Sequence, residues 1–224
     1  MSLTNVSHPY YPRDLDLPHY VASTMPLEKI LAIFFGMVAL VTLAANAAIG
    51  TRKNISHMEK FTFIWFIISG TIHIVMEGYF SWNHSNIAGN QFVIAQLWKE
   101  YAKSDSRYLS SDMFIVVMEF ITAHFDGPAC YLAAYALYKN LPYHHIVQLV
   151  VSVCHIYGDV LYYATSILEG SPHCTPHPYY FYFYFIFLNS FWIVIPLVLA
   201  IQSCCKLHEA MSFFLKTQHH QKSK

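Results

Sequence analysis

The sequence predicts an all-α, polytopic membrane protein in which a five-transmembrane-helix bundle surrounds an intramembrane ligand pocket. The chain of 224 residues is 55% hydrophobic and only 12% charged, which is poor in charge for a soluble domain of this size. Its apolar residues gather in five runs of about 20 residues or more, the length of helix that crosses a hydrocarbon core of roughly 30 Å. Four of these runs also carry polar or ionisable residues, which inside a membrane normally face a protein interior or a cavity.

Composition also narrows the classes of function. The formal net charge is zero and no run of like charges occurs, so nothing indicates a nucleic-acid partner. The five cysteines show no metal-ligand spacing, which predicts mostly free thiols and no metal site, with palmitoylation at Cys204 and Cys205 as a further option. No motif for a metal, nucleotide or redox cofactor occurs, so no cofactor is expected.

The predicted elements follow one another in three parts. A polar leader, residues 1–29, contains prolines that oppose helix formation and lacks the basic segment and apolar core of a signal peptide. The five-helix domain, residues 30–204, follows it, and the polar tail, residues 205–224, is expected to be disordered at its end. The spans are predicted at residues 30–49, 61–82, 113–138, 145–168 and 179–202.

Each span and connection has its own signal. The first span carries alanines suited to close packing and is expected to lie outside the pocket. Apolar and charged residues interleave between the second and third spans, which predicts a short amphipathic helix at the membrane interface. Gly127 and Pro128 interrupt the third span and predict a kink. Prolines predict a non-helical loop at 169–178, and an aromatic run that suits a membrane interface opens the fifth span.

Five spans place the two termini on opposite sides of the membrane. The side that holds the C-terminus carries more Lys and Arg residues, which predicts that the C-terminus is cytoplasmic. The sequons at Asn5 and Asn83 would then be lumenal and the sequon at Asn54 cytoplasmic, so the glycosylation pattern tests this topology.

A layer of polar side chains is the candidate site. The four later spans each carry a polar pair at helical spacing, and counting 1.5 Å per residue puts all four pairs roughly 8 to 15 Å below the same membrane face. The pairs are His73 with Glu77, Glu119 with Thr122, His155 with Asp159, and Asn189 with Trp192. This arrangement predicts an intramembrane pocket between the second, third, fourth and fifth spans.

Several polar residues also have an ordinary structural interpretation. His155 and Asp159 are explained equally well by an interhelical hydrogen bond. For His124 and Asp126, next to the break in the third span, local backbone hydrogen bonds or a lumen-facing position outweigh a chemical role. A lone Trp192 would be read as packing or as an interfacial anchor.

Glu77 and Glu119 are the leading functional candidates, because two glutamates at matched depth are hard to explain by structure alone. A carboxyl group in an apolar cavity can donate a proton near neutral pH, and a second carboxylate beside a histidine can accept one from another face of the same substrate. The indole of Trp192 can sit beside a cation. Proton addition, a stabilised cation and proton loss together amount to a double-bond isomerisation, which requires no cofactor.

Five segments of the chain resemble a known family in order and spacing. The segments are HIVMEGYF, LWKEYAKSDSRY, MEFITA, VSVCHIYGDVLYY and FLNSFWIVIP. The chain resembles the emopamil-binding protein family, the sterol Δ8,Δ7-isomerases of the endoplasmic reticulum, from its HPYYP leader to the fifth span. The resemblance implies an enzyme of cholesterol synthesis that shifts a ring-B double bond by protonation at carbon 9, a carbocation at carbon 8 and loss of a proton at carbon 7.

The resemblance also implies roles for the polar layer. By position, the family's functional residues are His73, Glu77, Glu119, Thr122, Asn189 and Trp192. The histidine and the two glutamates are expected to divide the acid and base roles, the threonine and asparagine to orient them, and the tryptophan to stabilise the cation. Tyr108 and Arg107 resemble part of a pocket lid, and Asp159 is expected to support the site.

The family's ligands and location supply the remaining expectations. Cationic amphiphilic drugs such as emopamil and tamoxifen are expected to bind, since a protonated amine on a lipophilic frame resembles the carbocation. The expected partners are a Δ8 sterol such as zymostenol, these amines, the lipid bilayer, and a homodimer or a complex with other enzymes of sterol biosynthesis. The expected location is the endoplasmic reticulum membrane, although the tail holds only a partial dilysine signal.

Two further classes of function stay open. The alternative to the enzyme is a non-catalytic member of the same fold family, which keeps the pocket as a sterol or drug receptor. A transporter is a third interpretation, disfavoured because the sequence shows no inverted repeat.

Overall fold

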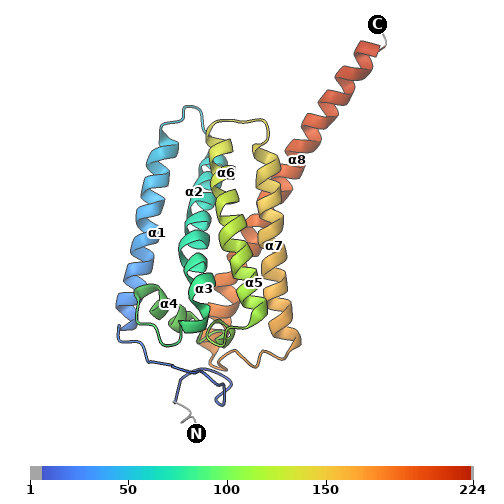
Figure 1. The fold of residues 1–224 in the computed structure, drawn as a ribbon. Coiled ribbons are helices and arrows are strands. Elements are labelled where there is room, and N and C mark those ends of the chain that lie inside the picture. The colour runs from blue at the N-terminus through green and yellow to red at the C-terminus, as the bar shows by residue number, and fades with distance from the viewer. Residues whose placement is uncertain (1–6, 223–224) are drawn as a thin grey trace.

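The computed structural model describes residues 7–222, so the Asn5 sequon, the start of the leader and the last two residues of the tail lie outside the described residues. Within this range every regular element is a helix, and five helices are long and apolar enough to cross a membrane. The predicted fold class is therefore confirmed. Figure 1 shows the spans side by side, with the leader at one end of the bundle and the end of the last helix at the other.

Two of the spans are single α-helices. The first span is α1, Leu27–Gly50, and the fourth is α7, His144–Leu168. Each begins and ends within three residues of the predicted bounds.

The other three spans each combine α-helix with a π-helical segment. The second span consists of α2 (His57–Ile72), a π-helical turn (His73–Glu77), α3 (Gly78–Asn83) and a short 3₁₀ turn (His84–Asn86). The third consists of α5 (Met113–Ile121), a π-helical turn (Thr122–Asp126) and α6 (Gly127–Tyr138). The fifth consists of a π-helical segment (Tyr179–Leu188) and α8 (Asn189–Lys222).

The break predicted at Gly127 and Pro128 takes the form of a π-helical turn. Pro128 lies in the first turn of α6, where its missing N–H costs least. The turn Thr122–Asp126 precedes it and packs against the turn His73–Glu77 of the second span. π-helical turns often occur at functional sites, and here two of them meet inside the bundle.

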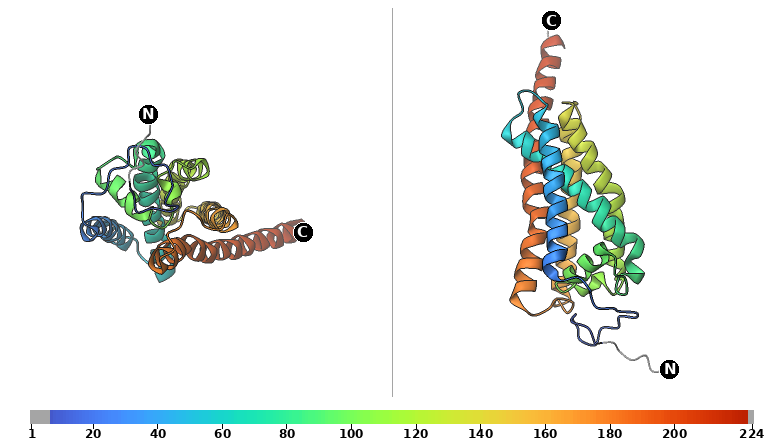
Figure 2. Two further views of the ribbon diagram at one scale, coloured as in Figure 1. Left: turned by 90° about the horizontal axis from the view of Figure 1, so that it is seen from below. Right: turned by 90° about the vertical axis from the view of Figure 1, so that its left-hand side faces the viewer.

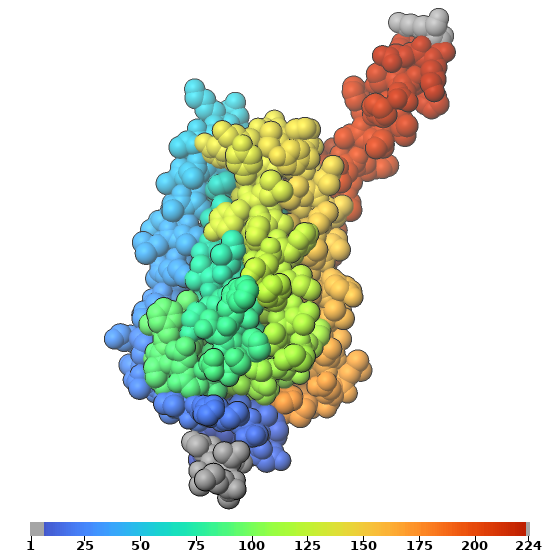
Figure 3. Space-filling model, in the orientation of Figure 1, coloured from blue at the N-terminus to red at the C-terminus, as the bar shows by residue number. Residues whose placement is uncertain are grey.

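A short helix closes the end of the bundle nearest the leader. α4, Val93–Tyr101, lies where the interleaved apolar and charged residues predicted a helix, and the 3₁₀ turn Ser106–Tyr108 follows it. In Figures 1 and 2 α4 lies across the lower end of the spans, and in Figure 3 the leader covers that end of the surface. Hydrogen bonds tie the leader to α4: Lys99 Nζ donates to Val21 O at 2.9 Å, and the backbone N–H groups of Thr24 and Met25 donate to Gln96 Oε1.

The tail departs from its expected structure. It was expected to be polar and disordered at its end, but α8 continues without interruption to Lys222 and projects beyond the other spans (Figures 1 and 2). The physical reason is that residues 203–222 contain neither glycine nor proline, so nothing ends the helix begun within the membrane. Lys206 and Glu209, one turn apart, also form an ion pair of 2.8 Å on its surface.

The two ends of the bundle have separate apolar clusters. One, here called the packed end, joins α1, α2, α6, α7 and α8 through Ala45, Ile49, Phe63, Phe66, Cys130, Ala133, Ala134, Leu137, Val151 and Leu199. The other, here called the aromatic floor, lies beside the leader and includes Tyr10, Phe80, Trp98, Tyr108, Tyr162 and Phe185. The candidate site lies between them.

Candidate intramembrane active site

A cavity of about 760 Å³ opens above the aromatic floor, within the size range of small-molecule sites. All five spans and α4 contribute to its wall. Ile30, Phe34 and Val38 of α1 are among the lining residues, so the expectation that the first span packs outside the pocket was wrong. The expectation failed because it assigned a span to the pocket only by a polar pair, whereas these α1 side chains are apolar.

The second span contributes a hydrogen-bonded chain to the cavity. His73 Nδ1 lies 2.8 Å from Glu77 Oε2, and His73 Nε2 lies 3.0 Å from His155 Nε2 on α7. All three residues line the cavity. His155 therefore forms the interhelical hydrogen bond that was one of its two interpretations, and its partner, His73, is itself a candidate residue of the site.

The third span places Glu119 opposite this chain. Glu119 is 5% exposed, and its carboxyl group accepts a hydrogen bond of 2.5 Å from the Tyr108 hydroxyl. The carboxyl groups of Glu119 and Glu77 lie close enough to interact directly, although they come from different spans. Tyr108 in turn stacks on Trp98, with ring centroids 4.8 Å apart. Glu77, Glu119 and Tyr108 therefore all line one cavity.

The fifth span adds Asn189 and Trp192 to the wall. Asn189 Oδ1 accepts a hydrogen bond of 2.9 Å from the Tyr101 hydroxyl, and Asn189 Nδ2 donates to Phe185 O at 2.7 Å. The Trp192 ring lies 6.3 Å from the His73 ring, and its buried Nε1 has no hydrogen-bond partner among the described residues.

The remaining candidates of the polar layer have different surroundings. Thr122 and Asp159 line the cavity, but the Thr122 hydroxyl donates to Met118 O at 2.8 Å rather than to either glutamate. Asp126 also lines the cavity and is 5% exposed, which corrects the expectation of a local or lumen-facing position. The π-helical turn that ends at Asp126 carries this side chain inward. His124 is exposed and accepts a hydrogen bond from Trp82, away from the cavity.

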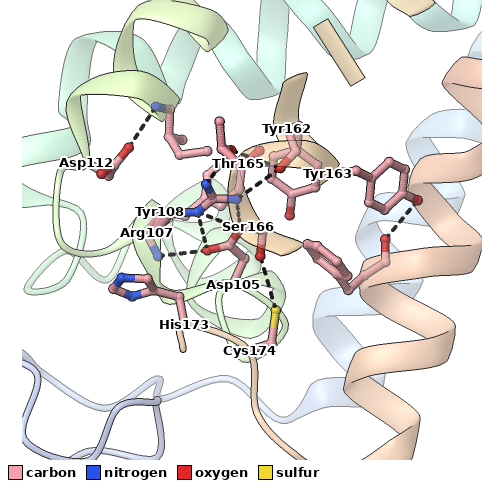
Figure 4. Close-up of polar contacts among 12 residues, drawn as sticks. Asp105, Arg107, Tyr108, Asp112, Tyr162, Tyr163, Thr165, Ser166, His173 and Cys174 are labelled. Carbon is pink, nitrogen blue, oxygen red and sulfur yellow. Dashed lines mark hydrogen bonds and ion pairs between the residues drawn. The ribbon is translucent and has the colours of Figure 1, made fainter. Parts of the chain in front are cut away.

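Arg107 is close to the site but does not line the cavity. In Figure 4 its guanidinium contacts both Asp105 oxygens and donates to Thr165 Oγ1 at 2.9 Å. Burial acts to lower the pKa of Arg107, but the hydrogen-bonded Asp105 carboxylate outweighs it and raises the pKa, so the guanidinium keeps its charge. Arg107 therefore anchors the turn that carries Tyr108, rather than forming a lid.

Sequence reasoning missed Tyr101, which joins α4 to Asn189. It lies in the segment LWKEYAKSDSRY, but it is one of 17 tyrosines and has no spacing relation to the fifth span. Burial raises the pKa of Tyr101, and burial together with the charge of Glu119 raises that of Tyr108. Both phenols therefore remain neutral hydrogen-bond donors.

The fold and the cavity together define a five-helix membrane protein with several carboxyl groups, Glu77 and Glu119 among them, at one largely apolar site. The family described as EXPERA (EXPanded EBP superfamily) matches residues 93–203. The chain is 37% identical over 206 residues to a probable 3-beta-hydroxysteroid-Delta(8),Delta(7)-isomerase of Arabidopsis thaliana, covering 92% of this chain and 91% of that protein. It is 38% identical over 209 residues to the 3-beta-hydroxysteroid-Delta(8),Delta(7)-isomerase of Rattus norvegicus, covering 92% and 90%.

The chain belongs to the family of 3-beta-hydroxysteroid-Delta(8),Delta(7)-isomerases, and it is an isomerase. The receptor and transporter interpretations are therefore not needed. A protoglabretal synthase of Ailanthus altissima is also 34% identical over 92% of this chain and 95% of its own length. Relatives of this similarity thus carry names for different reactions, and the substrate is argued separately below.

Proposed function

We propose that this isomerase moves the ring-B double bond of a sterol from the Δ8 to the Δ7 position. The observation that carries the proposal is that Glu77 and Glu119 reach one apolar cavity from two spans and lie close enough to interact. The names of the Arabidopsis and rat relatives describe this reaction. A rigid hydrocarbon skeleton suits a cavity whose wall is mostly aliphatic and aromatic.

The proposed reaction needs one proton donor and one proton acceptor. A carboxylic acid donates a proton to carbon 9, so the electron pair of the old double bond forms the new C–H bond and leaves a cation at carbon 8. A base then takes a proton from carbon 7, and that electron pair forms the new double bond. The composition of the sterol is unchanged. Glu119 and the His73–Glu77 pair divide the two roles, and general acid–base groups of this kind typically contribute about 10²- to 10⁴-fold to a rate.

The surroundings of the two acids support the intermediate. The Trp192 ring lies beside His73 and can place its electron-rich face near the cation at carbon 8. Tyr101 fixes Asn189 by a hydrogen bond of 2.9 Å, so this amide is held in one orientation at the wall. Thr122 is held by its own backbone, and its proposed contribution is the shape of the wall beside Glu119.

The same site is proposed to bind cationic amphiphilic amines. A protonated amine on a lipophilic frame has the charge and shape of the carbocation intermediate, and a site built for a transition state binds such mimics tightly. A tritiated amine ligand should be displaced by other amines of this kind, and Trp192→Leu should weaken its binding about tenfold or more. Equal binding to the wild type and the variant would remove Trp192 from the cation site.

The proposal includes a location and a pathway. The chain is proposed to lie in the endoplasmic reticulum membrane with its C-terminus in the cytoplasm, and to act in cholesterol synthesis. Protease added to sealed microsomes tests the orientation. An epitope after α8 should be digested without detergent, because α8 would project into the cytoplasm. An epitope that is protected until detergent is added would invert the topology.

Sterol analysis in a yeast strain that lacks Δ8,Δ7-isomerase tests the reaction. The wild type should restore Δ7 sterols, and Glu119→Gln and Glu77→Gln should each lose at least about 100-fold in activity. Glu169→Gln is the matched control, because Glu169 is exposed and lies outside the cavity. Immunoblots of the membranes should show equal amounts of all four proteins.

Deuterium labelling tests the proposed proton addition at carbon 9. In deuterated water the purified enzyme should place deuterium at carbon 9 of the product. Persistent Δ8 sterols with a well-expressed wild type, or a Δ7 product without deuterium, would contradict the proposed reaction.

A further inference from the structure

Three metal-ligating side chains from three different spans converge at the edge of the cavity. They are His73 in the second span, Cys130 on α6 and His155 on α7, and all three are buried. His73 Nε2 and His155 Nε2 are 3.0 Å apart, and Cys130 Sγ lies 3.7 Å from His155 Nε2. All three ligand atoms lie within 4.8 Å of one another. Sequence spacing gives no sign of this cluster, because each ligand belongs to a separate helix.

Two of the three separations are close to those of a tetrahedral zinc centre. Zn–N bonds of about 2.0–2.1 Å and a Zn–S bond of about 2.3 Å at tetrahedral angles put two nitrogens roughly 3.3 Å apart and nitrogen and sulfur roughly 3.6 Å apart. The distances in the protein, 3.0 Å and 3.7 Å, differ from these by a few tenths of an ångström. The third separation, from His73 Nε2 to Cys130 Sγ, is at most 4.8 Å. Binding therefore requires the Cys130 side chain to move toward His73 by up to about 1 Å, until the N–S distance is roughly 3.6 Å.

The second hydrogen bond of His73 supports a ligand role. Glu77 Oε2 lies 2.8 Å from His73 Nδ1, which matches the carboxylate–histidine–zinc arrangement found around many zinc sites. With the Nδ1 proton held by the carboxylate, the Nε2 lone pair is directed at the cluster. The charges also balance, since one Zn²⁺ ion, the Cys130 thiolate and the Glu77 carboxylate sum to zero. A neutral assembly avoids much of the cost of burying charge in a membrane.

We propose that His73, Cys130 and His155 bind Zn²⁺ with three protein ligands and one position open to the cavity, and that the bound ion inhibits the isomerase. Binding releases the Cys130 thiol proton to solvent. The His155 ring proton moves from Nε2 to Nδ1, an atom that has no hydrogen-bond partner among the described residues. The ion then coordinates His73 Nε2, so this nitrogen is no longer free to take part in proton transfer. The binding site stands on its own geometry, whereas the inhibition rests on the role proposed above for His73.

Cobalt substitution tests the site without reference to activity. Purified protein titrated with Co²⁺ should show an absorption band from thiolate-to-cobalt charge transfer, saturating at one ion per chain, and Zn²⁺ should displace the cobalt. Cys130→Ser should abolish the band. His155→Gln, which keeps a polar group of similar size, should weaken binding at least tenfold. Cys205→Ser is the matched control, because Cys205 is exposed and remote from the cluster, and it should bind as the wild type does.

Activity measurements separate the two parts of the proposal. Zn²⁺ should inhibit the wild type and Cys205→Ser at the same concentration. Cys130→Ser should need at least about tenfold more Zn²⁺ for the same inhibition. Metal-free Cys130→Ser should remain active, which shows that it folds. No stoichiometric binding by the wild type, or an unchanged cobalt band in Cys130→Ser, would overturn the site. Full activity with Zn²⁺ bound would overturn the inhibition. Neither result bears on the proposed isomerase reaction, which is measured on the metal-free protein.

Discussion

The packed end and the aromatic floor differ in the size of the side chains that lie between their helices. At the packed end, small residues let helices approach closely: a Cβ on Gly70 would lie 3.1 Å from both the Cys130 Cβ and the Gly127 carbonyl oxygen. At the other end, large rings such as Trp98 of α4 and Tyr108 of the turn Ser106–Tyr108 stack on one another beside the cavity that they line. Close packing of small residues stabilises membrane helices without a hydrophobic driving force. One end therefore fixes the bundle, which lets the other end enclose a cavity.

The largest expected effect is at the aromatic floor, where the Asp105–Arg107 pair is buried. Asp105→Asn should destabilise the protein by about 3–5 kcal/mol, because it leaves the Arg107 charge without its partner. Thermal unfolding followed by size-exclusion chromatography of the detergent-solubilised protein measures this. Glu209→Gln breaks the exposed Lys206–Glu209 pair and should leave the unfolding temperature unchanged. Equal effects of the two variants would mean that the buried pair is not a structural anchor.

A smaller effect is expected from adding a methyl group at the packed end. Gly70→Ala should destabilise by about 1–3 kcal/mol, since two of the three nearest atoms belong to the backbone or to a Cβ and cannot move away easily. Gly36→Ala adds the same methyl group to α1, where nothing lies within 4 Å, and should stabilise by up to about 1 kcal/mol through helix propensity. The same unfolding assay compares them. A stabilised Gly70→Ala would show that the packed end is looser than these distances indicate.

Removing one hydroxyl from the cavity should lower activity rather than stability. Tyr108→Phe deletes the hydrogen bond to Glu119 and should reduce kcat about tenfold, the rate equivalent of roughly 1.4 kcal/mol. Tyr163→Phe removes a hydroxyl that donates to the backbone carbonyls of Phe185 and Ile186 and does not line the cavity, so its kcat should change less than about twofold. A similar loss in both variants would indicate a general effect of tyrosine hydroxyls on folding.

The smallest effect concerns thiol reactivity in the loop beside the aromatic floor. Burial, reinforced by the charge of Asp105, raises the pKa of the Cys174 thiol to about 12. At about pH 8 only about one Cys174 in ten thousand is then a thiolate, the form that reacts. Cys174→Ser should therefore not change maleimide labelling of the folded protein. Replacing the exposed Cys204 and Cys205 with serine should remove most of the fast labelling. Fast labelling that is lost in Cys174→Ser would mean that this loop opens.

The sequence predicted the spans and the polar layer because both depend on local chemistry. Length and hydropathy determine which segments cross a membrane, and helical spacing places Glu77 one turn after His73 on the same face. The depth of Glu119 follows from the same counting. These calculations use only the position of a residue along its own helix.

The features that sequence reasoning missed depend on contacts between helices. The wall formed by α1 consists of apolar side chains, which look the same whether they face lipid or a ligand. The hydrogen bond from Tyr101 to Asn189 and the approach of Cys130 to His155 join residues 88 and 25 positions apart. No periodicity records such pairs. The extension of α8 was missed because a polar composition suggested disorder, although residues 203–222 contain neither glycine nor proline that would end the helix.

The π-helical turns change the direction in which the later side chains of a span point, compared with an uninterrupted α-helix. Each residue of an α-helix turns the chain by about 100°, so the extra residue in a π-helical turn shifts every later side chain around the axis by that angle. Deleting Val75 from the turn His73–Glu77 would keep the span long enough to cross the bilayer. It would, however, rotate α3 and its side chains about the helix axis relative to α2. Two spans of this protein, the second and the third, make that shift where their turns pack together. The orientation of the candidate groups that follow each turn thus depends on one extra residue.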